Sequence, residues 1–159
     1  MRNIVIFGNS GSGKSTLAKR LCSSEDLSHL DLDTLAWKPT SPPERAPVED
    51  SKLEILDFLD SNRNWVIEGC YSDLVEIVLP FSNEIIFMNL PVELCIENAR
   101  SRPWEPHKYE SKQAQDSNLK MLIGWISQYS ERTDTFSALA HTRLYEQYSG
   151  EKIMITSNE

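Results

Sequence analysis

The sequence predicts a doubly wound three-layer α/β sandwich, in which helices cover both faces of a five-stranded parallel sheet. Several apolar runs are continuous rather than alternating, which is typical of strands buried on both faces. Helical patterns separate these runs, and the first run leads directly into the sequence GNSGSGKS at residues 8–15. Because crossovers between parallel strands are right-handed, this alternation of strands and helices produces three layers.

Five segments are expected as strands, and all except the second have a continuous apolar core. They are residues 3–7, 28–32, 64–67, 84–89 and 152–156. Ligands of such sheets bind beyond the carboxyl ends of the strands, so residues that follow a strand are the candidates for function.

Helical patterns fill most of the segments between the strands. They cover residues 14–22, 48–61, 71–79 and 91–101, and a stretch from about 112 to 148. In the second helix, Leu53, Leu56 and Leu59 are expected to face the core. Pro91 suits the first turn of the fourth helix. Four prolines between residues 38 and 47 predict a loop.

The composition is that of a single globular domain, expected to span residues 1–159. No apolar stretch approaches the roughly 20 residues that a bilayer span needs, and we expect no signal peptide. Three cysteines without metal-like spacing favour a reduced, cytoplasmic setting, and we expect a monomer or weak homodimer. The net charge of −8 argues against direct binding of nucleic acid or of an anionic membrane.

The segment GNSGSGKS fits G-x-x-x-x-G-K-[ST], the phosphate-binding loop, in its required place between a strand and a helix. Its glycines let backbone N–H groups turn inward around a polyphosphate. Lys14 is expected to reach the β- and γ-phosphates and Ser15 to hold Mg²⁺, while the helix adds its positive amino end. The predicted ATP- and Mg²⁺-binding residues are Gly8, Asn9, Ser10, Gly11, Ser12, Gly13, Lys14, Ser15 and Thr16.

Two carboxylates follow the second expected strand. Asp31 and Asp33 are two residues apart, so an extended backbone would point both of them the same way. We predict that Asp33 lies across from the phosphate loop, where it can accept the proton of an attacking hydroxyl or bind Mg²⁺ through water. The alternative is that Asp33 caps the next helix. Trp37 is either one wall of an acceptor pocket or a core residue.

A further group of candidates follows the third expected strand. Glu68 is expected to hold metal-bound water or an acceptor hydroxyl, or alternatively to pair with an arginine of a lid. Gly69 permits close approach of the backbone to a bound group, and Tyr71 is placed beside it as a substrate-binding residue. Cys70 is expected to be a packing residue, because nothing nearby in the sequence lowers its pKa.

Arginines are the candidates for neutralising charge in phosphoryl transfer. A polar segment with two prolines at about residues 100–115 breaks a helix and is predicted to be a lid. Arg100 and Arg102 lie in it, and Arg132 can return to the same site. Arg102 and Arg132 are the predicted catalytic pair, and solvated arginines are the alternative. No chemical role is expected for the three histidines, which are His29, His107 and His141.

These runs together resemble the small P-loop proteins known as DNA topology modulation proteins, which are similar in fold to adenylate and shikimate kinases. The resemblance is carried by residues 8–16, 33–39 (DTLAWKP), 65–72 (WVIEGCYS) and 86–91 (IFMNLP). Cys70 stands where the family has asparagine, and the lid has fewer arginines. The resemblance implies an adenylate-kinase-like P-loop NTPase fold, binding of ATP and Mg²⁺, and a lid near residues 100–112. Because few residues follow the last strand, the closing helix of these kinases is expected to be absent.

The predicted function is that of an enzyme, a small-molecule kinase that moves the γ-phosphoryl group of ATP to a compact hydroxyl- or phosphate-bearing acceptor. Lys14, Mg²⁺ on Ser15 and Arg102 would neutralise charge, and Asp33 would orient the acceptor. The alternative is a regulatory protein in which ATP switches the lid or an oligomer without any acceptor. Asp33 and Glu68 favour the kinase, and the small number of lid arginines favours the switch. The last residues, 156–158, are expected to touch the adenine.

Overall fold

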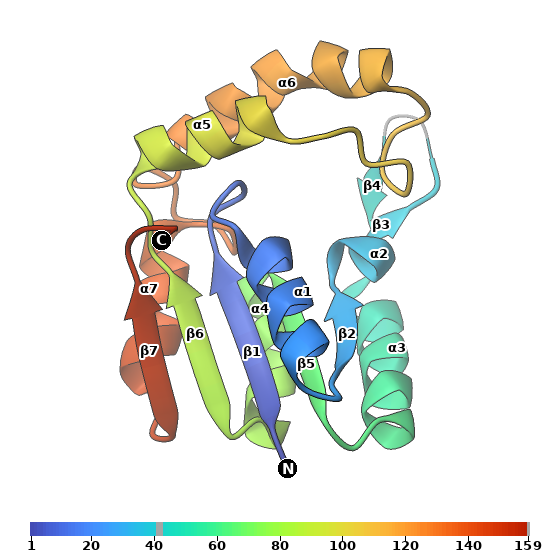
Figure 1. Cartoon of the computed structure of the whole chain (residues 1–159), viewed down its shortest axis with the longest axis vertical. Helices are drawn as coiled ribbons and strands as arrows, with labels where there is room; N and C mark the ends of the chain where they lie inside the picture. The colour runs from blue at the N-terminus through green and yellow to red at the C-terminus, as the bar shows by residue number, and fades with distance from the viewer. Residues whose placement is uncertain (41–42, 159) are drawn as a thin grey trace.

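The computed structural model describes residues 1–40 and 43–158, and it contains the predicted parallel sheet (Figure 1). The five strands lie in the order β2-β5-β1-β6-β7, and each neighbouring pair is parallel. Their bounds are β1 (Asn3–Gly8), β2 (Ser28–Asp31), β5 (Trp65–Gly69), β6 (Glu84–Met88) and β7 (Glu151–Ile155). With β1 at the centre, the segment that follows it is flanked by the segments that follow β5 and β6.

Helices cover both faces of the sheet, as predicted. Their bounds are α1 (Lys14–Ser24), α2 (Asp33–Ala36), α3 (Val48–Ser61), α4 (Ser72–Val78), the 3₁₀ helix η1 (Leu79–Phe81), α5 (Val92–Ser101), α6 (Lys112–Ser127) and α7 (Ala138–Gln147). Side chains of α3, α4 and α7 pack on one face, and those of α1, α5 and α6 on the other. Figure 1 shows α5 and α6 extending across the end of the sheet that carries the loop after β1.

The stretch from 112 to 148, predicted as helical throughout, is two helices on opposite faces of the sheet. Serine caps begin both of them: the Ser111 hydroxyl accepts from the Ala114 N–H at 3.0 Å, and the Ser137 hydroxyl accepts from the Ala140 N–H at 3.1 Å. The segment between the helices carries Arg132, so the break decides where this side chain lies.

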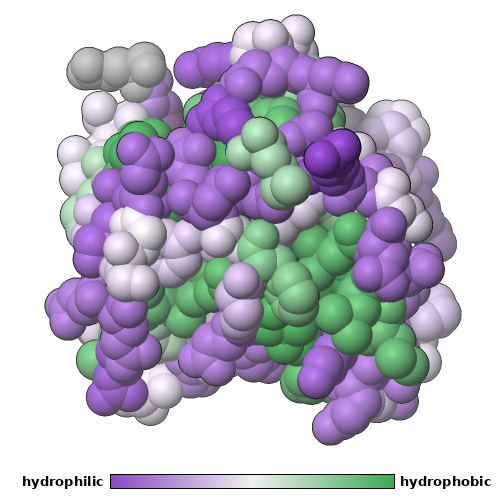
Figure 2. Space-filling model, turned by 90° about the horizontal axis from the view of Figure 1, so that it is seen from below, coloured by the Kyte–Doolittle hydropathy of each residue, from purple (hydrophilic) through white to green (hydrophobic). Residues whose placement is uncertain are grey.

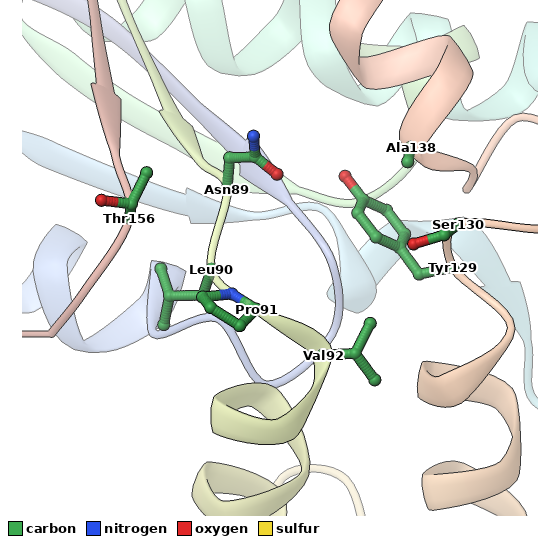
Figure 3. Close-up of a pocket in the computed structure, with 8 residues that line it drawn as sticks. All are labelled: Asn89, Leu90, Pro91, Val92, Tyr129, Ser130, Ala138 and Thr156. Atoms are coloured by element: carbon green, nitrogen blue, oxygen red, sulfur yellow. The ribbon is translucent and has the colours of Figure 1, made fainter.

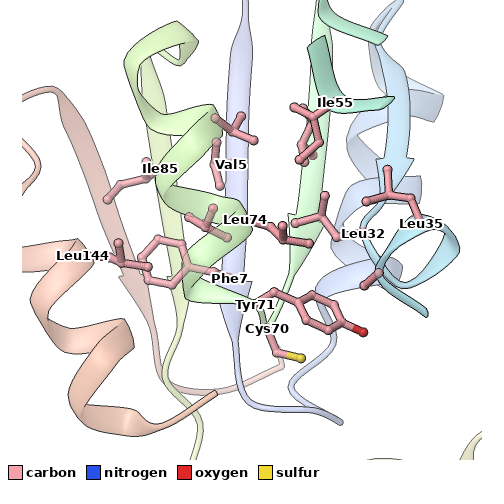
Figure 4. Packing of buried hydrophobic residues seen from close by; sticks show 14 of the residues in the cluster. Val5, Phe7, Leu32, Leu35, Ile55, Cys70, Tyr71, Leu74, Ile85 and Leu144 are labelled. Atoms are coloured by element: carbon pink, nitrogen blue, oxygen red, sulfur yellow. The ribbon is translucent and has the colours of Figure 1, made fainter. Parts of the chain in front are cut away.

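The core is built around the central strands (Figure 4). Val5 and Phe7 of β1 are fully buried on the face that α4 and α7 cover, while Ile4 and Ile6 are buried on the other face. Burial on both faces was predicted correctly for β1, β5 and β6 but wrongly for β7, whose Ile153 is 50% exposed. Because β7 is an edge strand, an apolar run alone did not reveal that its faces are open.

Two local predictions need correction. The inward face of α3 is formed around the buried Ile55, and Leu53, predicted to face the core, is 68% exposed. The segment predicted as a loop between residues 38 and 47 also contains a short antiparallel hairpin, formed by β3 (Trp37–Lys38) and β4 (Glu44–Arg45). Residues 41–42 of that loop lie outside the described residues. No helix of the described chain is both long and apolar enough to cross a bilayer.

The face at the opposite end of the molecule, seen in Figure 2, gathers apolar side chains over part of its surface. A shallow cavity of about 470 Å³ lies among η1, the end of α7 and the turn before β7, lined in part by Leu79, Leu144 and Tyr148. It lies away from the carboxyl ends of the strands, so it belongs to a different region from the phosphate loop.

His141 is a core histidine held in one tautomer. Its Nε2–H donates to the carbonyl oxygen of Cys70 at 2.8 Å, so Nδ1 accepts from the Tyr129 hydroxyl at 2.7 Å. Burial lowers the pKa of His141 to about 4. The unfolded chain therefore binds more protons than the folded chain between pH 6.5 and 4, and the stabilising contribution of neutral His141 is lost as the pH falls through that window.

We expect the wild type to lose about 2 kcal/mol of unfolding free energy between pH 7 and pH 5 that a His141→Gln variant does not lose. Urea unfolding of both proteins across this range measures the difference. The pKa of Asp31, raised to about 6, contributes with the opposite sign, but it is shared by both proteins and cancels. Parallel stability profiles for the two proteins would contradict the assignment to His141.

Candidate active site

The loop after β1 is shaped by glycines that no other residue can replace without strain. Gly11 and Gly13 have positive φ angles of 77° and 92°. A Cβ at Gly11 would lie 2.4 Å from the carbonyl oxygen of Cys95, so α5 packs directly on the loop backbone. Helix α1 begins at Lys14 without a side-chain cap. Because the first N–H groups of a helix lack intrahelical partners, this end of α1 suits the binding of an anion.

Two buried side-chain oxygens of this loop have no hydrogen-bond partner among the described residues. The Lys14 ammonium donates to the carbonyl oxygen of Asn9 at 2.7 Å, which folds the side chain back over the loop. The Asn9 amide donates to the carbonyl oxygen of Ile126 at 3.3 Å, whereas its own Oδ1 and the Ser12 hydroxyl have no hydrogen-bond partner among the described residues. Unpaired buried polar atoms are uncommon in folded proteins. They indicate that the loop is built to surround a polar ligand.

Ser15 in the first turn of α1 faces Glu68 of β5. The Ser15 hydroxyl donates to Glu68 Oε2 at 2.6 Å, and His29 Nε2 lies 3.0 Å from the same oxygen. Glu68 is 2% exposed. The alternative that Glu68 pairs with a lid arginine is therefore not what the structure shows. No role was predicted for His29, although its position two residues before Asp31 on β2 places both side chains on the same side of the strand.

The backbone after β2 is not extended, contrary to the prediction. Leu32 has helical angles of φ −62° and ψ −21°, and Asp33 is the first residue of α2. Asp31 Oδ1 accepts from the Asp33 N–H at 2.9 Å. The carboxylate that binds the first N–H group of this helix is therefore that of Asp31 and not that of Asp33. The carboxylates of Asp31 and Asp33 nevertheless lie close together, because the single helical turn at Leu32 brings both of them to the Lys108 ammonium.

The Lys108 ammonium lies between these carboxylates, and this residue of the segment predicted to be a lid was not among the predicted site residues. Its ammonium lies 2.7 Å from Asp33 Oδ2 and 3.7 Å from Asp31 Oδ2, and 3.6 Å from Glu105 Oε2. The Tyr71 hydroxyl donates to Asp33 Oδ1 and accepts from the Trp37 indole N–H at 2.8 Å. Trp37 is 42% exposed, so the core alternative for this residue is wrong.

The two aspartates have pKa values on opposite sides of the ordinary value. Burial, followed by the charges of Glu68 and Asp33, raises the pKa of Asp31 to about 6. Burial also acts to raise the pKa of Asp33, but the charge of Lys108 and hydrogen bonds from Lys108 and Tyr71 outweigh it, so this pKa is lowered. Burial opposes the charged form of Lys108, yet Asp33 and Asp31 raise its pKa. Lys108 and Asp33 are therefore a charged pair at neutral pH.

The three arginines considered as candidates differ in how close they lie to the phosphate loop. Arg102, in the segment predicted to be a lid, pairs with Glu105 at 3.4 Å, and Arg100 is exposed at the end of α5. Arg132 stacks on the Trp125 ring at 4.1 Å and donates from Nη1 to the carbonyl oxygen of Trp125 at 3.1 Å. This carbonyl is next in the chain to that of Ile126, which Asn9 binds. Arg132 is thus anchored beside the phosphate loop, and Arg102 is not.

Gly69 and Cys70 serve packing in this structure. A Cβ at Gly69 would lie 2.9 Å from the Leu32 Cβ. The group that approaches the Gly69 backbone closely is therefore the Leu32 side chain, in the turn between β2 and α2, whereas a bound group was expected there. Cys70 is buried, and burial raises the pKa of its thiol to about 12. These properties fit the predicted packing role of Cys70.

Two asparagines lie against the other side of the loop. The Asn98 amide of α5 donates to the carbonyl oxygen of Gly11 at 2.8 Å and to Asn158 Oδ1 at 2.7 Å. Asn158 in turn donates to the carbonyl oxygen of Ser12 at 3.1 Å. The segment predicted to touch the adenine therefore lies at the phosphate loop. Asn98 was missed, because nothing in the sequence connects a helix residue to the chain end.

A cavity of about 320 Å³ lies at the same end of the sheet (Figure 3). Its lining follows β6 and β7 and includes the segment between α6 and α7, with residues Asn89, Leu90, Pro91, Val92, Tyr129, Ser130, Ala138 and Thr156. None of these residues belongs to the phosphate loop. The cavity is a neighbour of the candidate active site rather than the place where the charged residues meet.

A family match and a relative were found in comparisons with known proteins. A family model described as an AAA domain matches residues 4–118. Protein YqaC of Bacillus subtilis (strain 168), which is uncharacterised, is 29% identical over 133 residues, covering 80% of this chain and 72% of the relative. No described group of three or more histidine, cysteine or acidic side chains is arranged to hold a metal ion by itself.

Solved structures of kinases share the fold over nearly the whole chain. An unliganded sugar kinase from Janibacter sp. HTCC2649 has a TM-score of 0.58 at 15% identity, covering 98% of this chain and 85% of its own. A deoxyadenosine kinase from M. mycoides with bound dATP scores 0.50 at 12% identity, with coverage of 98% and 91%. A gluconokinase from Sinorhizobium meliloti 1021 scores 0.50 at 15% identity, with coverage of 99% and 84%.

At these identities the likeness establishes the fold and not the substrate. The matched family region contains β1, the phosphate loop, α1 and the strands β2, β5 and β6. The motif, the strand order and the family match agree with one another. The chain belongs to the AAA domain family of P-loop NTPases.

Proposed function

We propose that this protein is a small-molecule kinase, which transfers the γ-phosphoryl group of ATP to a compact acceptor. The observation that carries the proposal is Arg132, whose Nε and Nη2 are buried without a hydrogen-bond partner among the described residues. Nε lies 3.5 Å from Asp134 Oδ2, so the guanidinium has one ion-pair contact, and Nη2 makes no hydrogen bond to the described residues. A guanidinium with unpaired buried donors beside a phosphate loop suits the charge that develops on a transferred phosphoryl group.

The nucleotide would be held by residues 8–16. Backbone N–H groups of the loop and the amino end of α1 would bind the phosphates, and the Lys14 ammonium would exchange the Asn9 carbonyl for the β- and γ-phosphates. The amides of Asn98 and Asn158, which already lie against the loop, are placed to bind the rest of the nucleotide. ATP is proposed as the nucleotide because the loop motif is complete.

The pair formed by Ser15 and Glu68 fits Mg²⁺. The hydroxyl and the buried carboxylate present oxygen atoms to each other at 2.6 Å, and oxygen is the ligand that Mg²⁺ prefers. Mg²⁺ bound there would neutralise charge on the phosphates. His29 contacts the same oxygen of Glu68 that Ser15 does, and so helps to fix the orientation of this carboxylate.

The acceptor would bind on the side formed by β2, α2 and the residues after β5. Asp33 is proposed to orient the attacking hydroxyl and take its proton, and Tyr71 and Trp37 would contact the acceptor. The segment at about residues 100–115 is proposed as a lid, since Lys108 spans from it to Asp33. Arg102 would join the site only if the lid moved it away from Glu105.

One observation favours the second candidate, a nucleotide switch without an acceptor. Lys108 closes on the carboxylate that the kinase would need, at 2.7 Å. The two functions differ in one measurement, which is ADP formation from ATP and Mg²⁺ with and without a deproteinised metabolite extract. The kinase predicts that the extract accelerates ADP formation, and the switch predicts equal rates.

Other features of the proposal follow from charge and composition. The net charge of −8 supports a protein without a direct nucleic-acid partner. The three cysteines are free, which supports the proposed cytoplasmic setting. We further propose a single domain, a monomer or weak homodimer, and membership of the DNA topology modulation proteins within the wider family.

The loop itself is tested by Lys14→Ala. We expect this variant to bind Mg²⁺–ATP at least tenfold more weakly than the wild type, which is about 1.4 kcal/mol, because the ammonium is lost from the β- and γ-phosphates. Isothermal titration calorimetry measures both affinities. Lys19→Ala, an exposed position on the same helix, is the matched control and should bind normally. Equal affinities for the wild type and Lys14→Ala would contradict the proposed nucleotide site.

A further inference from the structure

We propose that the acceptor is an uncharged polyhydroxyl compound of the sugar or polyol class, and not a carboxylate or phosphate. The inference rests on the proposed phosphoryl transfer and narrows its substrate. It follows from the sign of the charges on the two sides of the candidate active site, and from how the basic side chains there are paired.

The acceptor side is acidic. Three carboxylates, from Asp31, Asp33 and Glu105, surround the single ammonium of Lys108 within 3.7 Å. Glu68, a further carboxylate, is the register partner of Asp31 on the neighbouring strand β5. An anionic group on the acceptor would be placed among these carboxylates and repelled by them.

Three basic side chains on this side are each paired with a carboxylate. Lys108 pairs with Asp33 at 2.7 Å, and Arg102 with Glu105 at 3.4 Å. Arg45 lies over the Tyr71 ring, 5.0 Å from its centroid, and pairs with Asp73 at 3.2 Å. Kinases that accept a phosphate or carboxylate need a guanidinium or ammonium free to bind it. These three groups are already neutralised in the described structure.

The positive groups that keep donors for a ligand lie on the other side, at the phosphate loop. Lys14 binds only a backbone carbonyl there, and the Nη2 of Arg132 has no hydrogen-bond partner among the described residues, while its Nε lies 3.5 Å from Asp134 Oδ2. Positive charge is therefore concentrated where the phosphates of ATP would bind, and negative charge where the acceptor would bind. This division suits an anionic nucleotide and an acceptor that carries no negative charge.

The remaining groups on the acceptor side suit hydroxyls and carbon–hydrogen faces. An ionised carboxylate only accepts hydrogen bonds, so Asp31 and Asp33 would each take hydroxyl donors, with short and strong bonds. The Trp37 ring is 42% exposed and meets Tyr71 edge to face, with centroids 6.4 Å apart. Such rings combine an apolar surface with a polar edge. Polyols present both kinds of group in alternation.

The transfer is balanced without any further reactant. The acceptor oxygen forms a bond to the γ-phosphorus while the bond between that phosphorus and the β,γ-bridging oxygen breaks, so that ADP leaves. The hydroxyl proton passes to the carboxylate of Asp33 and from there to water. Lys108 must withdraw from Asp33 for this to happen, and an incoming polyol can replace its ammonium with hydroxyl donors.

The test separates acceptors by charge. A deproteinised metabolite extract of Bacillus subtilis is passed through an anion-exchange resin, and each fraction is added to the protein with Mg²⁺ and ATP. ADP formation is measured against a blank without extract, and the phosphorylated product is identified by mass spectrometry. We expect acceptor-dependent ADP formation to be at least tenfold faster with the unretained fraction. Asp33→Asn, run in parallel, should lose this activity, and Asp57→Asn, at an exposed position on α3, should keep it.

Each other outcome has a distinct meaning. Activity that is equal in the two fractions, or confined to the retained one, would overturn the polyol assignment and leave the proposed kinase standing. Activity in neither fraction, from protein that still binds Mg²⁺–ATP by calorimetry, would overturn the kinase and with it the polyol assignment.

Discussion

Replacing Asp33 with asparagine is expected to lower kcat for phosphoryl transfer by roughly 10²–10⁴-fold, the usual contribution of a positioned general base. The dissociation constant of ATP should stay within a few-fold, because Asp33 lies on the acceptor side and not in the phosphate loop. Its bond to the Tyr71 hydroxyl can persist in the amide, and Lys108 retains Asp31 and Glu105 as partners. The variant is therefore expected to fold normally and to lose chemistry selectively.

Steady-state kinetics with the acceptor fraction, together with calorimetry of ATP binding, measures the two quantities for Asp33→Asn. Asp57→Asn, which is exposed on α3, makes the same chemical change away from the site and should behave as the wild type. If ATP binding and turnover fell together, Asp33 would be a metal ligand or a fold element. If neither changed, the kinase would lose its proposed base and the nucleotide switch would be the better account.

Arg132→Lys is expected to lower kcat by about 10³-fold, the lower range for an arginine that stabilises a phosphoryl-transfer transition state. Lysine keeps the positive charge but not the planar fork, and its ammonium cannot replace Nε and Nη2 together. ATP binding should change little, since the backbone of the loop and Lys14 remain. The loss should therefore appear in kcat rather than in the affinity for ATP.

Arg132 also supports the segment between α6 and α7, because it stacks on Trp125 and binds its carbonyl. Urea unfolding of the variant separates the two roles. A variant that unfolds as the wild type does and turns over slowly supports the catalytic role. The exposed Arg143 on α7 provides the matched control as Arg143→Lys. Normal turnover in Arg132→Lys would show that the unpaired nitrogens do not serve catalysis.

The fold and the phosphate loop could be predicted because their signals are local. A continuous apolar run such as that of β1 marks a buried parallel strand, and the GNSGSGKS segment fixes the place of Lys14 and Ser15. The exposure of β7 could not be predicted, because an edge strand and an inner strand have the same apolar run. Burial there depends on neighbours, which are a property of the whole sheet.

The acceptor side could be predicted only in part because its contacts join distant parts of the chain. Asp33 was predicted correctly as a residue at this end of the sheet, but its partner Lys108 is separated from it by 75 positions. A lysine in a polar segment carries no sign of that contact. The same holds for His29 and Glu68, which are brought together by the pairing of β2 with β5. Arginines were the predicted site residues of the segment at about 100–115, but the residue of this segment that contacts Asp33 is a lysine.

The fate of a radiolabelled γ-phosphate tests the central claim most directly. The protein is incubated with Mg²⁺, γ-labelled ATP and the deproteinised extract, and the label is followed into organic phosphates and into inorganic phosphate. We predict that label enters an organic phosphate faster than inorganic phosphate is released without extract, and that Asp33→Asn and Arg132→Lys both suppress this transfer. Label that remains in ATP, or that appears only as inorganic phosphate at the same rate with and without extract, would contradict the account.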